Sequence, residues 1–93
     1  MLMDIVAAEP LGEYRLRLRF EDGVEGVVDL ALDLSFQGVF EPLRDPGYFA
    51  QVHVDPDLGT VVWPNGADLD PDVLYARVTG TPIILEGDLH LAR

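Results

Sequence analysis

Residues 60–75 predict a strand, a tight turn and the start of a helix, and this succession restricts the possible folds more than any other stretch. Residues 60–63 are β-branched or aromatic, which favours a pleated, half-buried strand. Pro64 lacks an N–H and therefore ends the strand or lies at a sheet edge. Asn65 and Gly66 supply the positive φ angles that a tight turn needs.

Several independent signals mark the start of the helix. Asp70 is the expected N-cap, because its carboxylate can accept hydrogen bonds from the free N–H groups of the first turn. Pro71 fits the first helical position, and Asp72 places negative charge at the positive end of the helix dipole. Gly80 is a typical helix stop. We therefore predict a helix over residues 71–79.

The clearest strand covers residues 14–20, where apolar and basic side chains alternate strictly. The apolar set must face the core, and the arginines must face the other side. The core-facing set is Tyr14, Leu16, Leu18 and Phe20, and the other set is Arg15, Arg17 and Arg19.

The turn after this strand follows from the register that keeps acidic side chains out of the core. A two-residue loop would place Glu25 and Asp29 on the core face, whereas a three-residue loop over residues 21–23 pairs Phe20 with Val24. In that register Arg19 lies opposite Glu25 and Arg15 lies opposite Asp29. We therefore expect cross-strand ion pairs, each contributing about 0.2–1 kcal/mol.

The remaining segments complete an α+β prediction. Residues 2–9 predict a first strand and residues 10–12 its turn. Residues 31–51 predict short helical turns, and Asp45 and Pro46 repeat the cap-and-proline signal, which predicts a helix over 46–50. Residues 52–54 predict a strand antiparallel to 60–63. We expect a small, mainly antiparallel sheet of about five strands with short helices packed on one face. Residues 1–80 form a single domain in this interpretation, and residues 81–93 form a C-terminal extension that is either a last strand or a docked tail.

The chain resembles a bacterial family of domains of unknown function, DUF2442. The resemblance spans roughly residues 4–78 and is most specific in the tryptophan segment at residues 63–75; shorter matching pieces lie at residues 20–23, 29–30, 43–45 and 48–49. It implies a compact α+β domain. Such domains occur alone or joined to a helix-turn-helix segment, and sometimes beside genes that look like toxin–antitoxin pairs. The family has no established catalytic residues to carry over.

Composition narrows the functional classes. The formal net charge is −11, there are no cysteines, and all six basic residues are arginines. Nucleic-acid binding needs clustered positive charge, so we expect no nucleic-acid partner and instead a protein partner with a basic surface. The sequence shows no signal peptide and no membrane-length apolar run, so we expect no membrane association and a cytoplasmic location.

The candidate chemistry is weak. Asp68, Asp70 and Asp72 alternate like calcium ligands, but Val73 and Thr79 occupy the positions where an EF-hand loop needs glycine and glutamate. The absence of cysteine and lysine removes thiolate and Schiff-base chemistry. The sequence therefore predicts no catalytic residue, no metal site and no cofactor, and leaves carboxylate-only chemistry open.

Two functional hypotheses follow. The leading one is a non-enzymatic protein-interaction module, a candidate acidic member of a toxin–antitoxin-like pair. The alternative is a small-ligand or metal-binding domain that uses the corner at residues 63–72. The candidate binding residues there are Trp63, Asn65, Asp68, Asp70 and Tyr75, although core packing of Trp63 and turn stabilisation by Asn65 and Asp68 explain the same residues.

The C-terminal extension offers one further surface. Residues 83–85 are apolar, so they must pair with a sheet edge of their own chain or cover a neighbouring subunit. We expect a homodimer that forms through residues 81–93.

Overall fold

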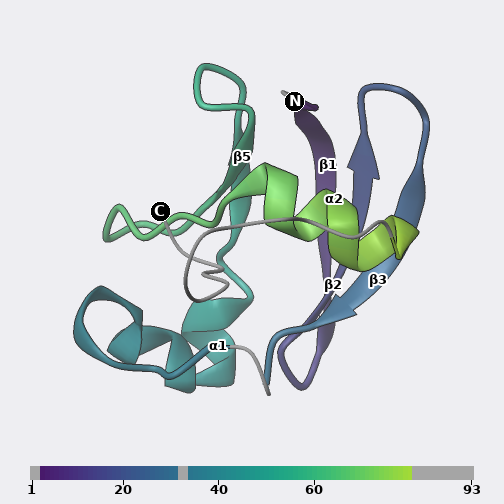
Figure 1. The fold of residues 1–93 in the computed structure, drawn as a ribbon. Helices are drawn as coiled ribbons and strands as arrows, with labels where there is room; N and C mark the ends of the chain where they lie inside the picture. The colour runs from purple at the N-terminus through teal and green to yellow at the C-terminus, as the bar shows by residue number, and fades with distance from the viewer. Residues whose placement is uncertain (1–2, 32–33, 81–93) are drawn as a thin grey trace, which may run out of the picture.

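The computed structural model describes residues 3–31 and 34–80, which contain five antiparallel strands in two sheets and three short helices (Figure 1). This arrangement confirms the predicted α+β class. One sheet has the strand order β1-β2-β3, and the other contains β4 and β5. The elements are β1 (Ile5–Gly12), β2 (Arg15–Phe20), β3 (Glu25–Asp29), the 3₁₀ helix η1 (Gly38–Arg44), α1 (Pro46–Phe49), β4 (His53–Asp55), β5 (Thr60–Val62) and α2 (Pro71–Thr79).

The hairpin between β2 and β3 has the predicted three-residue loop. The Phe20 N–H donates to the Val24 carbonyl at 2.8 Å, and Gly23 has a φ of +91°. Leu18 lies opposite Gly26 and Leu16 lies opposite Val28, as the hydrophobic pattern requires. The core-facing residues of β2 are fully buried, so the register argument is confirmed.

The first turn was predicted wrongly. β1 continues through the expected turn at residues 10–12, and the chain reverses at Glu13 and Tyr14, whose φ angles are +52° and +66°. Positive φ at both central residues is typical of a type I′ hairpin loop. Tyr14 occupies this conformation while its ring packs against Phe36 and Phe49 and its hydroxyl donates to the Arg44 carbonyl. Tertiary packing therefore sets the conformation of residues 13 and 14, whereas Gly12, with a φ of +91°, precedes them as the last residue of β1.

Both predicted helix caps are present. The Asp45 side chain accepts a hydrogen bond from the Gly47 N–H at 2.9 Å at the start of α1. Asp70 accepts one from the Asp72 N–H at 2.9 Å at the start of α2, and Gly80 ends α2 in the left-handed conformation. The cap-and-proline signals therefore located both helices correctly.

The two sheets meet at β1, and α2 lies across one face of the three-stranded sheet (Figure 1). The Ile5 N–H donates to the Gly59 carbonyl at 2.9 Å, which ties β1 to the β4–β5 hairpin. Gly26 allows α2 to pack closely against β3, because a Cβ atom at this position would lie only 2.5 Å from the Cγ1 atom of Val78. The buried core therefore lies on the α2 side of the three-stranded sheet.

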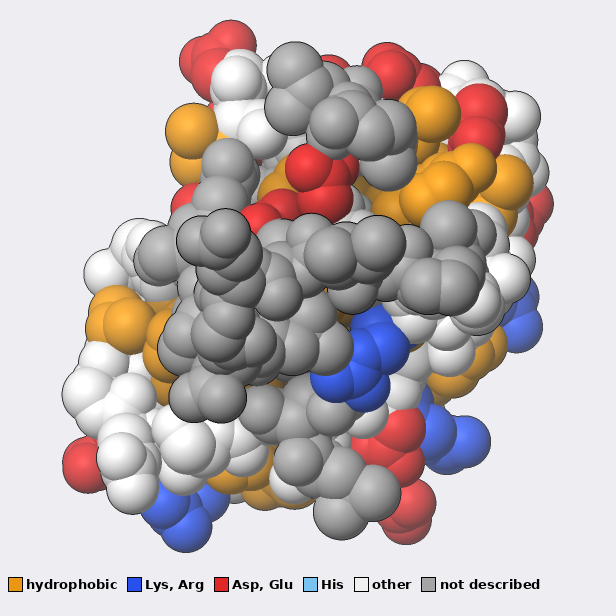
Figure 2. Space-filling view, viewed as in Figure 1, with side chains coloured by type: hydrophobic (Ala, Val, Ile, Leu, Met, Phe, Trp, Pro, Cys, Tyr) orange, Lys and Arg blue, Asp and Glu red, His pale blue; other side chains and the backbone are white. Residues whose placement is uncertain are grey.

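The view from the α2 side shows acidic side chains in several places around the rim and arginines in a few separate groups (Figure 2). The predicted C-terminal extension at residues 81–93, and the homodimer contact expected from it, lie outside the described residues.

Candidate interaction surface

The three-stranded sheet buries one face and exposes the other. The alternation of β2 sends its apolar side chains into the core and its arginines outward, and β3 alternates in step with it. Antiparallel sheets commonly pack one face on the core and leave the other in water. We call the exposed side the outer face; its residues are Ala7, Glu9, Arg15, Arg17, Arg19, Glu25, Val27 and Asp29.

The charges of the outer face alternate in sign across the strands. Arg17 Nη1 lies 3.8 Å from Glu9 Oε1 on β1, with the two side chains 56% and 63% exposed. The ion pairs that the register predicted between β2 and β3 do not form: no ion pair joins Arg15 to Asp29 or Arg19 to Glu25 among the described residues, although each pair lies in register.

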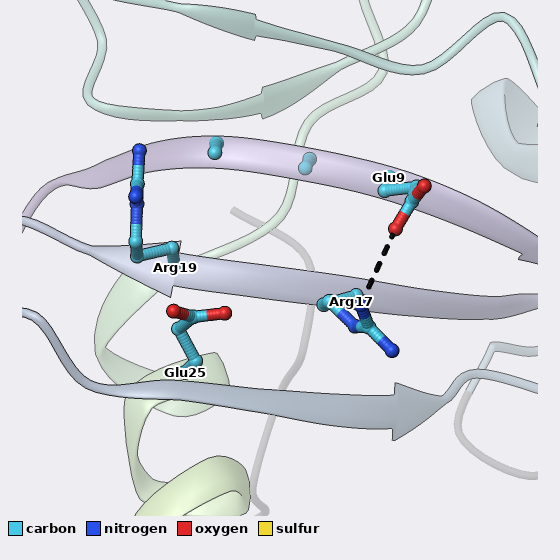
Figure 3. Close-up of a pocket in the computed structure, with 6 residues that line it drawn as sticks. Glu9, Arg17, Arg19 and Glu25 are labelled. Atoms are coloured by element: carbon cyan, nitrogen blue, oxygen red, sulfur yellow. Dashed lines mark ion pairs between the residues drawn. The ribbon is translucent and has the colours of Figure 1, made fainter.

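Figure 3 shows the reason for one of these absences. Arg19 extends over β1, while Glu25 lies on the opposite side of β2. A fully exposed ion pair gains little in water and restricts two long side chains, so register alone does not bring such groups together. The acids at the margins of the outer face therefore remain accessible to a partner.

A shallow hollow of about 220 Å³ lies on the outer face (Figure 3). The small side chain of Ala7 leaves room on the outer face between the longer residues around it. Two arginines and two glutamates border it, so its formal charge is balanced. Such an open hollow suits a side chain of a docked protein better than an enclosed small ligand. Its lining residues are Ala7, Ala8, Glu9, Arg17, Arg19 and Glu25.

At the corner of residues 63–72, Trp63 and Asn65 have structural partners. Trp63 is 1% exposed, and its Nε1 donates to the Phe49 carbonyl at 2.9 Å. Asn65 Nδ2 donates to the Val39 carbonyl at 2.8 Å, and its Oδ1 accepts from the Ala67 N–H at 3.1 Å. The indole is thus part of the core, and Asn65 fastens the turn to the segment before α1.

Of the other three candidate residues, Asp68 and Asp70 precede α2 and Tyr75 lies within it. Asp68 lies in a β-bridge with Val62, and Asp70 caps the helix. The Tyr75 hydroxyl donates to Asp22 Oδ2 at 2.6 Å, linking α2 to the β2–β3 loop. This hydrogen bond holds the pKa of Asp22 below its usual range and raises the pKa of Tyr75. A binding role for these five residues stays a prediction.

The corner also holds an unusual carboxylate. Asp72 Oδ1 is buried and has no hydrogen-bond partner among the described residues. Among the described residues, no three histidine, cysteine, aspartate or glutamate side chains are grouped so that they could hold a metal ion. Within residues 3–31 and 34–80, no helix has the length and apolarity needed to cross a membrane.

The outer face follows only in part from the sequence. The alternation of residues 14–20 places the arginines outside the core and explains them as members of cross-strand ion pairs. The exposure of Val27, at 49%, and the hollow beside Glu9 depend on which strands lie side by side. The pairing of β1 with β2 is seen only in the structure.

Comparison with known proteins places the described fold in a family. No curated protein and no solved structure matches the chain significantly. The model of the DUF2442 family, described as a protein of unknown function, matches residues 5–80, from the first residue of β1 to the glycine that ends α2. The match covers most of the sequence, and the chain therefore belongs to the DUF2442 family.

Proposed function

We propose that this chain is a non-enzymatic protein-interaction module that binds a partner with a basic surface through the outer face. The observation that carries the proposal is an exposed sheet face that combines charges of both signs with the half-exposed Val27. Protein interfaces commonly combine an apolar contact with a polar, charged rim. The outer face offers both elements on a rigid sheet.

The charge of the whole chain supports the sign of the partner. A net charge of −11 steers oppositely charged proteins toward it and repels nucleic acids. The arginines of β2 do not reverse this preference, because acidic residues flank them on both neighbouring strands. A basic partner also suits the toxin–antitoxin context that the family resemblance implies.

The corner at residues 63–72 offers less support for its alternative role. Its indole already has a hydrogen-bond acceptor and is buried, and its amide bridges two backbone groups. A ligand would have to compete with these contacts.

The proposal can be tested by affinity purification from the native host followed by mass spectrometry. Three baits should be compared: the unchanged chain, a Glu9→Gln/Glu25→Gln variant that removes two acids of the outer face, and a control variant with the same change in net charge, Glu41→Gln/Asp57→Asn. The control changes two exposed acids outside the outer face. We expect a protein that the unchanged and control baits retain and that the outer-face variant loses.

Two further checks make the outcome decisive. Circular dichroism must show that all three baits are folded, and the retained protein must bind the purified bait directly. Equal retention by the outer-face variant would show that the partner binds elsewhere, and the assignment of the outer face would be wrong.

A further inference from the structure

Among the described residues, β3 forms an edge of the three-stranded sheet and presents backbone hydrogen-bonding groups away from β2. β3 is the last strand in the order β1-β2-β3. The Phe20 N–H donates to Val24 at one end of the β2–β3 pair, and the Leu30 N–H donates to Tyr14 at the other. Hydrogen-bonded positions alternate along an antiparallel pair, so the N–H and C=O groups of Glu25, Val27 and Asp29 point outward.

A second hollow lies along this edge. It has a volume of about 170 Å³ and is lined by Val27, Val28, Asp29 and Arg77. Val27 and Val28 are consecutive and project to opposite faces of the sheet, one exposed and the other buried. A space that touches both must lie beside the strand rather than above either face. The open backbone groups and this space therefore coincide.

Side chains at the edge define what can bind there. Glu25, Val27 and Asp29 lie on the same face, in the order acidic, apolar, acidic. Directly opposed cross-strand pairs are stabilised by opposite charges and destabilised by like charges. Glu25 forms no ion pair with any described residue, so its charge is available.

The charges argue against a second copy of the chain at this edge. Two β3 strands that pair antiparallel around Val27 would set Glu25 of each copy opposite Asp29 of the other. This arrangement juxtaposes four carboxylates in a pair of chains that each carry a charge of −11. The same acids favour a strand that carries basic residues at the opposed positions.

We infer that the edge of β3 binds an extended segment of the partner protein by strand addition, and that this segment has the pattern basic–any–apolar–any–basic. Backbone hydrogen bonds to Glu25, Val27 and Asp29 hold the segment, and its alternate side chains give specificity. The two basic side chains pair with Glu25 and Asp29, and the central apolar one contacts Val27. The inference rests on the proposed function and adds the binding mode and the chemistry of the partner.

The test uses the full chain and a synthetic peptide, Ser-Arg-Thr-Val-Thr-Arg-Ser, titrated and followed by backbone amide NMR. The expected result is a saturable shift of the Glu25, Val27 and Asp29 amide signals. Val27→Pro removes an N–H that points outward and spares the hydrogen bonds between β2 and β3, as edge positions tolerate. We expect this variant to remain folded and to lose the peptide.

Charge variants test the side-chain pattern separately. Glu25→Gln/Asp29→Asn should bind the peptide about tenfold more weakly. The matched control Glu41→Gln/Asp57→Asn carries the same change in net charge and should bind within about twofold of the unchanged chain. A peptide with glutamate in place of both arginines should not bind.

Three results would overturn the inference: no binding of the basic peptide at millimolar concentration, undiminished binding by a folded Val27→Pro variant, or self-association through β3 in place of peptide binding. None of these would by itself refute the proposed function. Affinity purification with the Glu9→Gln/Glu25→Gln bait would still show whether a partner uses the outer face.

Discussion

Replacing Thr60 by valine tests how the start of β5 is fastened to the segment that leads into α2. Thr60 is fully buried, and its Oγ1 donates to the Leu69 carbonyl at 2.6 Å. Leu69 is also fully buried and immediately precedes the Asp70 cap. Valine has nearly the same shape as threonine but cannot donate, so Thr60→Val removes this hydrogen bond while preserving most of the packing.

The magnitude follows from the burial of both groups. Removing one partner of a buried hydrogen bond leaves the other desolvated and costs about 1–3 kcal/mol. In a domain of this size, a loss of about 2 kcal/mol lowers Tm by about 8–16 °C. Thr60→Ser keeps the hydroxyl and loses one methyl group, which costs about 1 kcal/mol through packing.

Urea unfolding followed by far-UV circular dichroism measures both changes. We expect the midpoint for Thr60→Val to fall further than that for Thr60→Ser, with equal m values for all three proteins. A free energy of unfolding for Thr60→Val within about 0.5 kcal/mol of the unchanged protein would refute the reasoning, as would a larger loss for Thr60→Ser.

Three further changes probe the cap, the first turn and the hydrogen bond between α2 and the β2–β3 loop. Asp70→Ala removes the N-cap acceptor of α2 and should lower the free energy of unfolding, measured in urea, by about 0.5–2 kcal/mol. Asp70→Ser keeps a cap acceptor and should retain most of this stability, whereas equal stability of Asp70→Ala and the unchanged protein would contradict the capping role. Glu13→Asn should raise Tm, because asparagine tolerates the left-handed conformation at Glu13 better, and an unchanged or lower Tm would argue that the turn is not strained. The hydrogen bond between Tyr75 and Asp22 lowers the pKa of Asp22, so its contribution to stability is present above the ordinary pKa of 3.8 and is lost as the pH falls through the lowered pKa. The same hydrogen bond raises the pKa of Tyr75, so the contribution to stability is present below the ordinary pKa of 10.0 and is lost as the pH rises through the raised pKa. Tyr75→Phe should therefore flatten the pH profile of stability at both extremes, and an unaltered profile would show that this hydrogen bond does not matter in solution.

Local signals located most of the elements. The hairpin register could be derived because only one loop length buries Leu16 and Leu18 while keeping Glu25 out of the core. Both caps could be derived because aspartate followed by proline has a direct physical role at a helix start. The turn at Glu13 and Tyr14 could not, because its conformation depends on distant contacts of the tyrosine ring.

The candidate surface was only partly visible for the same reason. Alternation showed that Arg15, Arg17 and Arg19 face away from the core, which the structure confirms. Which strand ends the sheet is a property of the whole fold, so neither the open edge of β3 nor the hollow beside Val27 follows from local pattern. The absence of the expected ion pairs depends on side-chain directions that register does not determine.

The position of Trp63 makes the intrinsic fluorescence of this protein a selective reporter. The chain has one tryptophan, which is shielded from water, and its ring packs against Phe49. Its emission should therefore be blue-shifted in the folded state and move to longer wavelength when the core opens. The outer face and the edge of β3 do not include this indole, so a strand added there should leave the emission unchanged. A spectral change on binding would instead signal a rearrangement of the core.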